Sequence, residues 1–116
     1  MPHDLKLFSA HALLSEEVAS RDGHRIGVIK DVVIDFEQGR AAYFIVATGG
    51  VFGIGAKLIA LPWRLLRRVG HTLYIDAEKS LLDRAPPFDE GAEDFGEVEA
   101  VWQGRASTDR GARVEH

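Results

Sequence analysis

The stretch GHRIGVIKDVVIDFE, residues 23–37, decides the fold of this chain. It is rich in isoleucine and valine, and from residue 26 to residue 37 its even positions are apolar apart from Lys30, which is the alternation of a β-strand with one buried face. The alternation blurs around Lys30 and Asp31, so we expect a bend or bulge there that curls the sheet. The sequence therefore predicts a small all-β domain built from hairpins.

Turn signals bound this strand on both sides. An Asp-Gly pair at 22–23 precedes it and Gly39 follows it, and glycine adopts the positive φ angles that tight turns need. The next strand, 41–47, is apolar on both faces, which is typical of a central strand covered on both sides. Along these two strands we expect Ile34, Phe36, Phe44 and Val46 to lie in the core.

The rest of the chain is predicted in short pieces. Strands are expected at 57–61 and 72–77, a first strand or strand-plus-turn at 5–14, and a short paired segment at 18–20. Residues 63–68 are expected to form a turn or helical piece, and 78–84 one or two helical turns. The pair Leu61-Pro62 is expected to leave regular pairing, because proline has no N–H to donate. Residues 88–116 are expected to be irregular.

Composition sets further bounds. The 116 residues are 46% hydrophobic and suffice for one domain with a real core. Absence of cysteine excludes disulfides, thiol catalysis and cysteine-ligated metals, and it fits a reducing compartment. Neither a signal-peptide pattern nor an apolar run of about 20 residues is present, so we expect a soluble, cytoplasmic protein without membrane insertion. The net charge of −4 is a poor match to nucleic acid.

A series of motifs resembles the PRC-barrel family. The matching segments are the Gly-x-x-Ile-Gly-x-Ile-x-Asp-Val-Val-Ile-Asp pattern at 23–35, the run at 43–46, the glycine loop at 49–55, the run at 58–63 and the Ala-Pro-x-Phe at 85–88. The resemblance implies a PRC-barrel domain over residues 5–88, followed by a polar C-terminal tail over 89–116. It implies a mostly antiparallel β-barrel of five to six strands with short helical turns. Such barrels occur in the cytoplasmic part of the photosynthetic reaction-centre H subunit and in a bacterial ribosome maturation factor, as well as in stand-alone proteins.

Candidate chemical groups are better explained as structure. The glycine loop 49–55 is followed by a β-like segment, whereas a phosphate cradle has to open a helix. Asp31, Asp35 and Glu37 share one strand face at about 6.6–7 Å per two-residue step, which is too wide for a shared metal or acid–base site and typical of a solvated face. His24 and His71 lie in predicted turns, and neither a zinc spacing nor a serine-hydrolase motif is present. We therefore expect that the protein has no catalytic residue, cofactor or metal, and that it is not an enzyme.

The expected function is that of a non-catalytic interaction module that self-associates or docks on a protein. Its candidate surface combines an aromatic and basic cluster with an apolar loop, and it comprises Tyr43, Val51, Phe52, Ile54, Trp63, Arg64, Arg67 and Arg68. Apolar residues in excess of one small interior favour a homodimer. The competing cover is the tail, with Val98, Val101 and Trp102, packed on its own barrel or on a neighbour. Alternative functions are a ribosome- or RNA-associated maturation factor, suggested by the Trp63–Arg68 cluster, and a reaction-centre accessory protein.

Overall fold

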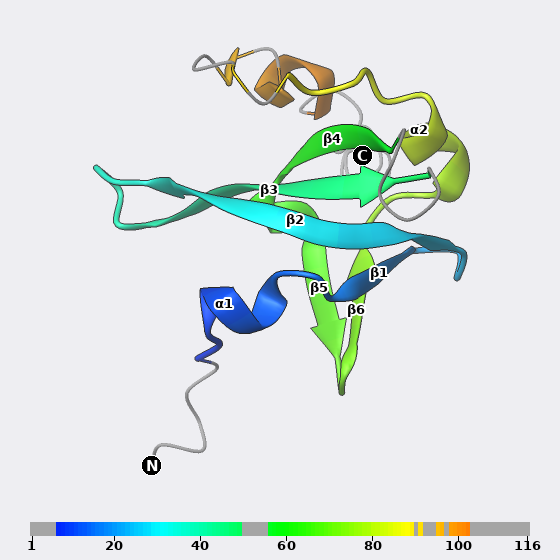
Figure 1. The fold of residues 1–116 in the computed structure, drawn as a ribbon, viewed down its shortest axis with the longest axis horizontal. Helices are drawn as coiled ribbons and strands as arrows, with labels where there is room; N and C mark the ends of the chain where they lie inside the picture. Colours follow the sequence, from blue (N-terminus) through cyan, green and yellow to red (C-terminus); the bar gives the residue numbers. More distant parts are fainter. Residues whose placement is uncertain (1–6, 50–55, 90, 92–94, 97, 103–116) are drawn as a thin grey trace, which may run out of the picture.

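Six strands form one sheet in the order β4-β3-β2-β1-β6-β5 (Figure 1). The computed structural model describes residues 7–49, 56–89, 91, 95–96 and 98–102. The strands are β1 (Glu17–Ser20), β2 (Arg25–Asp35), β3 (Arg40–Thr48), β4 (Lys57–Pro62), β5 (Leu66–Val69) and β6 (Thr72–Ile75). Neighbouring strands in this sheet are antiparallel except β1 and β6, which are parallel. The predicted small, mostly antiparallel all-β fold is confirmed.

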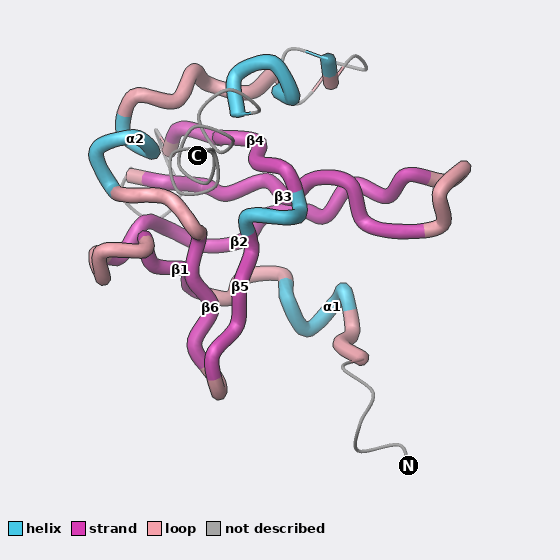
Figure 2. The backbone as a smooth tube through the Cα atoms, turned by 180° about the vertical axis from the view of Figure 1, so that it is seen from behind, coloured by secondary structure: helices cyan, strands magenta, loops and turns pink. Residues whose placement is uncertain are grey.

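The two edge strands are joined by the chain and not by a hydrogen-bonded ladder. β4 and β5 stand at opposite ends of the strand order, yet only the 3₁₀ turn Trp63–Leu65 separates them in sequence. The sheet therefore curls back on itself, and β5 and β6 run roughly across the direction of β2 and β3 (Figures 1 and 2). The sheet is curled as expected, but its hydrogen bonding does not close into a complete barrel.

The bulge predicted in β2 is present. Ile29 pairs with Val46 and Asp31 pairs with Ile45, so Lys30 is an extra residue with no partner in the ladder. Such a bulge bends the strand and increases its twist. β2 pairs with β1 only in its first part, Arg25 to Val28, whereas it pairs with β3 from Gly27 to Asp35 and so extends beyond β1 as a long hairpin.

Half of the predicted core is correct and half is wrong. Phe44 and Val46 are fully buried, whereas Ile34 is 55% exposed and Phe36 is 96% exposed. The reason is the length of the β2–β3 hairpin. Backbone pairing of β2 with the β1 side ends at Ile29, and pairing of β3 with β4 ends at Tyr43, so residues 34–41 project beyond the sheet (Figure 1).

Three local predictions are corrected. Residues 10–13 form the one-turn helix α1 (Ala10–Leu13) and not a strand, because the Ser9 hydroxyl accepts from the Ala12 N–H at the helix start. Residues 66–69 form strand β5, which the sequence reading assigned to a turn or helical piece. Leu61 and Pro62 stay in register with β3, which proline tolerates on an edge strand. The short paired segment at 18–20 is present as β1, and helix α2 (Lys79–Asp83) falls within the predicted helical region.

The sheet is covered on its outer side by the C-terminal cap, meaning the described residues of 85–102. The Phe88 N–H donates to the Leu58 carbonyl of β4 at 2.7 Å, and the Trp102 indole N–H donates to the Ala60 carbonyl at 2.9 Å. Both bonds satisfy acceptors along the edge strand β4, which protects that edge. Residues 96 and 98–102 are helical, so this part of the predicted irregular tail is ordered on its own barrel.

The C-terminal cap also explains the two-sided apolarity of β3. Phe44 and Val46 face the barrel interior, while Ile45 on the opposite face is buried as well. On that opposite face the Phe95 ring stacks on Tyr43 with centroids 5.1 Å apart. The expectation that 41–47 is a central strand covered on both sides is therefore confirmed.

Gly27 is required by close strand packing, which gives a first prediction. A Cβ atom at this position would collide with the carbonyl oxygen of Ala47 and lie 2.9 Å from its carbon, and backbone atoms of a central strand cannot move aside cheaply. We expect Gly27→Ala to lower the free energy of unfolding by about 1–3 kcal/mol. Urea denaturation measures the change. Gly91→Ala is the matched control, because its new methyl group would meet only the Asp89 carboxylate at an ordinary 3.6 Å; equal effects of the two substitutions would contradict the argument.

Asp22 ties the β1–β2 turn to helix α2, which gives a pH prediction. The Ser20 hydroxyl and the Lys79 N–H both donate to its carboxylate, and these bonds hold the pKa of Asp22 below its ordinary value of 3.8. A depressed pKa means that the stabilisation is present above pH 3.8 and is lost as the pH falls through the lower folded-state value. The difference in urea midpoint between wild type and Asp22→Asn should therefore shrink below about pH 4. A difference that stays constant with pH would exclude this role.

Candidate functional site

The predicted interaction residues fall into two separate groups. Val51, Phe52 and Ile54 lie outside the described residues. Tyr43 is half-buried under Phe95 of the C-terminal cap, and Arg64 pairs with Glu99 of the same cap at 3.2 Å. Burial, followed by the nearby Glu99 carboxylate, raises the pKa of Tyr43. Tyr43 and Arg64 thus hold the C-terminal cap against the sheet and are largely engaged within the chain.

The other predicted residues lie on and beside β5. Trp63 packs edge-on against Phe44, with ring centroids 6.2 Å apart. Arg67 lies 3.5 Å from the Asp76 carboxylate, and the Arg68 guanidinium lies over the Phe8 ring at 5.1 Å from its centroid. Arg67 shares the Asp76 carboxylate with Arg21, which lies 3.2 Å from it, so the charge of Arg67 is only partly balanced. Arg68 is exposed beside an aromatic ring.

An apolar groove lies where α1 meets this group. Its volume is about 350 Å³, and it is lined by Phe8, Leu13, Trp63, Leu66, Arg68 and Leu73. Leu13 and Leu73 are buried at its floor, whereas Phe8 and Arg68 are exposed at its rim. A concave apolar surface with one guanidinium at its edge is suited to receive an apolar side chain accompanied by a carboxylate. We call it the α1 groove.

A second apolar feature is convex. The tip of the β2–β3 hairpin, residues 34–37, presents Ile34 and the almost fully exposed Phe36. Sequence reasoning missed this surface because it placed both residues in the core. The sequence signal that was available is position: Phe36 directly precedes the turn that ends at Gly39, and the tips of loops are commonly exposed.

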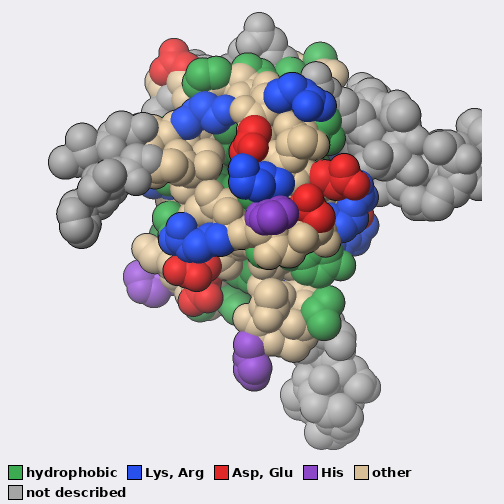
Figure 3. All heavy atoms as spheres, turned by 90° about the vertical axis from the view of Figure 1, so that its right-hand side faces the viewer, with side chains coloured by type: hydrophobic (Ala, Val, Ile, Leu, Met, Phe, Trp, Pro, Cys, Tyr) green, Lys and Arg blue, Asp and Glu red, His purple; other side chains and the backbone are tan. Residues whose placement is uncertain are grey.

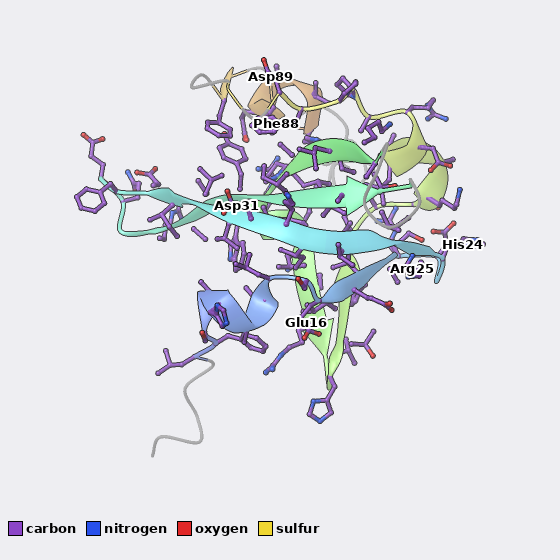
Figure 4. The ribbon with its side chains drawn as sticks, viewed as in Figure 1. Glu16, His24, Arg25, Asp31, Phe88 and Asp89 are labelled. Carbon is purple, nitrogen blue, oxygen red and sulfur yellow. The ribbon has the colours of Figure 1, made fainter. Side chains whose placement is uncertain are left out.

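The carboxylates considered for chemistry serve the backbone. Asp31 accepts from the Val32 N–H at 2.8 Å, and Asp35 accepts from the Gln38 N–H at 2.9 Å, which stabilises the hairpin turn. Figure 4 places Asp31 on β2, well away from His24 and Arg25 at the β1–β2 turn. Among the described residues, no group of three His, Asp or Glu side chains is placed to hold a metal ion.

A second groove, of about 510 Å³ and mixed polar and apolar lining, lies along β1 and the β5–β6 turn. Its lining includes Glu16, Glu17, Arg25 and His71. Arg25 and Glu17 form an ion pair at 3.4 Å across its wall. Charged side chains of both signs also alternate over the face that carries the β1–β2 turn and α2 (Figure 3). This pattern is typical of a solvated surface and not of a site for one highly charged ligand.

Comparisons with known proteins identify the family. The family model described as the PRC-barrel domain matches residues 6–82, which span both strands of the long hairpin, the α1 groove and most of helix α2. A search of the curated proteins finds no match to this chain. No helix in the described part of the chain is long and apolar enough to cross a lipid bilayer. With the match covering most of the chain and the curled six-stranded sheet in agreement, this chain belongs to the PRC-barrel domain family.

Proposed function

We propose that this protein is a non-catalytic interaction module that docks on another protein through the apolar surfaces left open by its sheet. The observation that carries the proposal is the distribution of exposed large hydrophobic residues. Among the described residues, five of the six exposed large hydrophobic side chains come from two short segments. Around α1 they are Leu7, Phe8 and Leu14, and at the hairpin tip they are Ile34 and Phe36. Concentrated apolar exposure of this kind is typical of binding surfaces.

The proposal includes the absence of an enzymatic activity. The carboxylates that sequence reasoning weighed, Asp31 and Asp35, are occupied with backbone N–H groups of their own strand and turn. A broad activity screen tests this part, with the Asp31→Asn/Asp35→Asn double variant as control. Turnover that the folded double variant lacks would replace the proposal with an active site on the β2 face.

A protein partner is favoured over RNA. The RNA alternative rests on the basic residues next to Trp63, but Arg64 is paired with Glu99, and Arg67 shares Asp76 with Arg21. Arg68 and the partly balanced Arg67 are then the main groups left for phosphates, and so few contacts give weak binding with a shallow salt dependence. RNA binding whose affinity falls steeply between low and high salt would favour the ribosome-associated alternative; the reaction-centre alternative has no observation in its favour here.

Affinity capture under source-cell conditions tests the docking role directly. The bait is the full chain, compared with a Phe36→Ser/Phe8→Ser variant that removes exposed rings from both apolar features. We expect a stoichiometric protein partner, a second copy included, that the variant loses. A bait that recovers the same proteins with and without the two rings would reject docking through these surfaces.

A cytoplasmic location is part of the proposal and rests on the sequence alone.

A further inference from the structure

We propose that the partner of the hairpin tip is a second copy of this chain, and that two copies exchange tips. In this arrangement, Phe36 of each protomer enters the α1 groove of the other, giving a two-fold dimer. The inference rests on the proposed function, since it assigns the occupant of the same apolar surfaces. It differs from the dimer expected from sequence, which used β3 and residues 51–54.

The apolar shapes are complementary. The tip is a narrow projection that ends in one aromatic ring, which is 96% exposed, with Ile34 behind it on the hairpin. The α1 groove is an apolar hollow of about 350 Å³ with Trp63, Leu66 and Leu73 in its lining. One chain thus carries both a projecting aromatic side chain and an apolar recess of a size that suits it. An aromatic anchor seated in a pocket is the usual centre of a protein interface.

The charges are complementary as well. Asp35 stands opposite Arg40 in the hairpin ladder and accepts from the Gln38 N–H, so Glu37 is the carboxylate that the tip offers to a partner. The groove offers Arg68, which lies over the Phe8 ring and forms no ion pair with a described carboxylate. Seating Phe36 in the groove therefore brings the Glu37 carboxylate of one copy toward an Arg68 guanidinium of the other that has no acidic partner in the described part of its own chain.

The position of the two features favours reciprocal exchange. The hairpin tip and α1 lie on the same side of the molecule, away from helix α2 (Figure 1). Two copies that face each other with this side are therefore able to insert both tips at once. A reciprocal contact closes after two copies, whereas an unreciprocated one would continue into a chain of molecules.

The first test is the mass in solution. By sedimentation equilibrium we expect wild type to reach twice the 12.8 kDa chain mass in a concentration-dependent way. Phe36→Ser should weaken association by about 30-fold or more, as removal of a central anchor does. Val69→Ser is the matched control, since Val69 is an exposed apolar residue outside the groove lining, and it should leave the dimer intact. A wild-type monomer at all concentrations, or a dimer that Phe36→Ser leaves unchanged, would overturn the proposal.

The second test uses the absence of cysteine in the chain. Glu37→Cys and Arg68→Cys proteins, mixed and oxidised mildly, should form a mixed disulfide that joins the tip of one copy to the groove of the other. As a control, the Glu37→Cys protein is mixed with a Glu78→Cys protein, whose cysteine stands next to α2 and far from the groove, and this mixture should form no such disulfide. The double variant Glu37→Cys/Arg68→Cys should stop at a cross-linked dimer; a ladder of higher polymers, or equal cross-linking to the Glu78→Cys protein, would reject reciprocal exchange.

The charge contact has its own check. Glu37→Lys and Arg68→Glu should each weaken the dimer severalfold, and the two exchanged together should restore it. Absence of restoration would remove this pair from the interface.

If the chain proves monomeric while affinity capture still recovers a different protein that depends on Phe36, the exchange fails and the docking function stands. If neither is observed, both fail.

Discussion

Replacement of Trp102 by alanine is expected to lower the free energy of unfolding by about 3–5 kcal/mol. Trp102 is only 2% exposed, and its indole N–H is bonded to the Ala60 carbonyl on the edge strand β4. The substitution removes the largest buried side chain of the C-terminal cap and leaves a buried carbonyl without its donor. Since total stability of a domain this size is roughly 5–15 kcal/mol, such a loss is severe.

Urea denaturation measures this change, and hydrogen exchange shows where it acts. If the cap detaches, the Phe88 N–H, which is bonded to Leu58, should lose protection. Trp102→Phe is the control, because it keeps an aromatic ring but removes the N–H, and it should cost about 1 kcal/mol for the lost hydrogen bond beyond its change in volume. A loss below about 1 kcal/mol for Trp102→Ala would mean that the cap does not rest on this residue.

The second large effect is expected at Phe44. This side chain is fully buried in the centre of the sheet, paired with Val32 and Leu61 across its two neighbouring strands and in edge contact with Trp63. Phe44→Ala leaves a cavity that a twisted sheet fills poorly, so we expect a loss of about 3–5 kcal/mol in the free energy of unfolding.

The same hairpin supplies the matched control. Phe36→Ala makes the identical chemical change at a position that is almost fully exposed, and in the monomer it should alter stability by less than about 0.5 kcal/mol. The contrast is measured by denaturant unfolding at low protein concentration. Comparable losses at the two positions would contradict the placement of Phe44 inside and Phe36 outside the core.

The same contrast shows what local sequence predicts in this protein. Alternation correctly predicted β2, and its interruption at Lys30 correctly predicted the bulge. The two-sided apolarity of β3 correctly predicted a strand covered on both faces. These properties are local, because side-chain period and turn chemistry belong to neighbouring residues.

The predictions that were wrong concern properties set by other parts of the fold, such as the lengths of neighbouring strands. Alternation places Ile34 on the same face as Val32, but it says nothing about whether another strand reaches far enough to cover that face. β1 and β4 both end short of the hairpin tip, so Ile34 and Phe36 are exposed. β5 was missed for a related reason: Arg67 and Arg68 suit a strand only because it is an edge strand.

The candidate site was only partly accessible from sequence. Trp63, Arg67 and Arg68 are neighbours in the sequence, but the groove beside them needs Phe8 and Leu13, which lie some fifty residues away in the chain. Likewise Tyr43 and Arg64 were assigned to an open surface, and it is the C-terminal cap that engages both. Contacts between distant segments of this kind leave no periodic signal.

The parallel pairing of β1 with β6 has a consequence for the order in which this protein folds. The β2, β3 and β4 strands follow one another as a meander, so their contacts form between near neighbours. The β1–β6 pairing instead joins Val18 to Leu73, and the Arg21–Asp76 bond beside it has the same separation of 55 positions. The chain must lose the entropy of closing that loop before this pairing gains anything. We therefore expect the meander to form the folding nucleus and β1 to dock on β6 late, with φ-values near zero at Val18 and Leu73 as the signature in refolding kinetics.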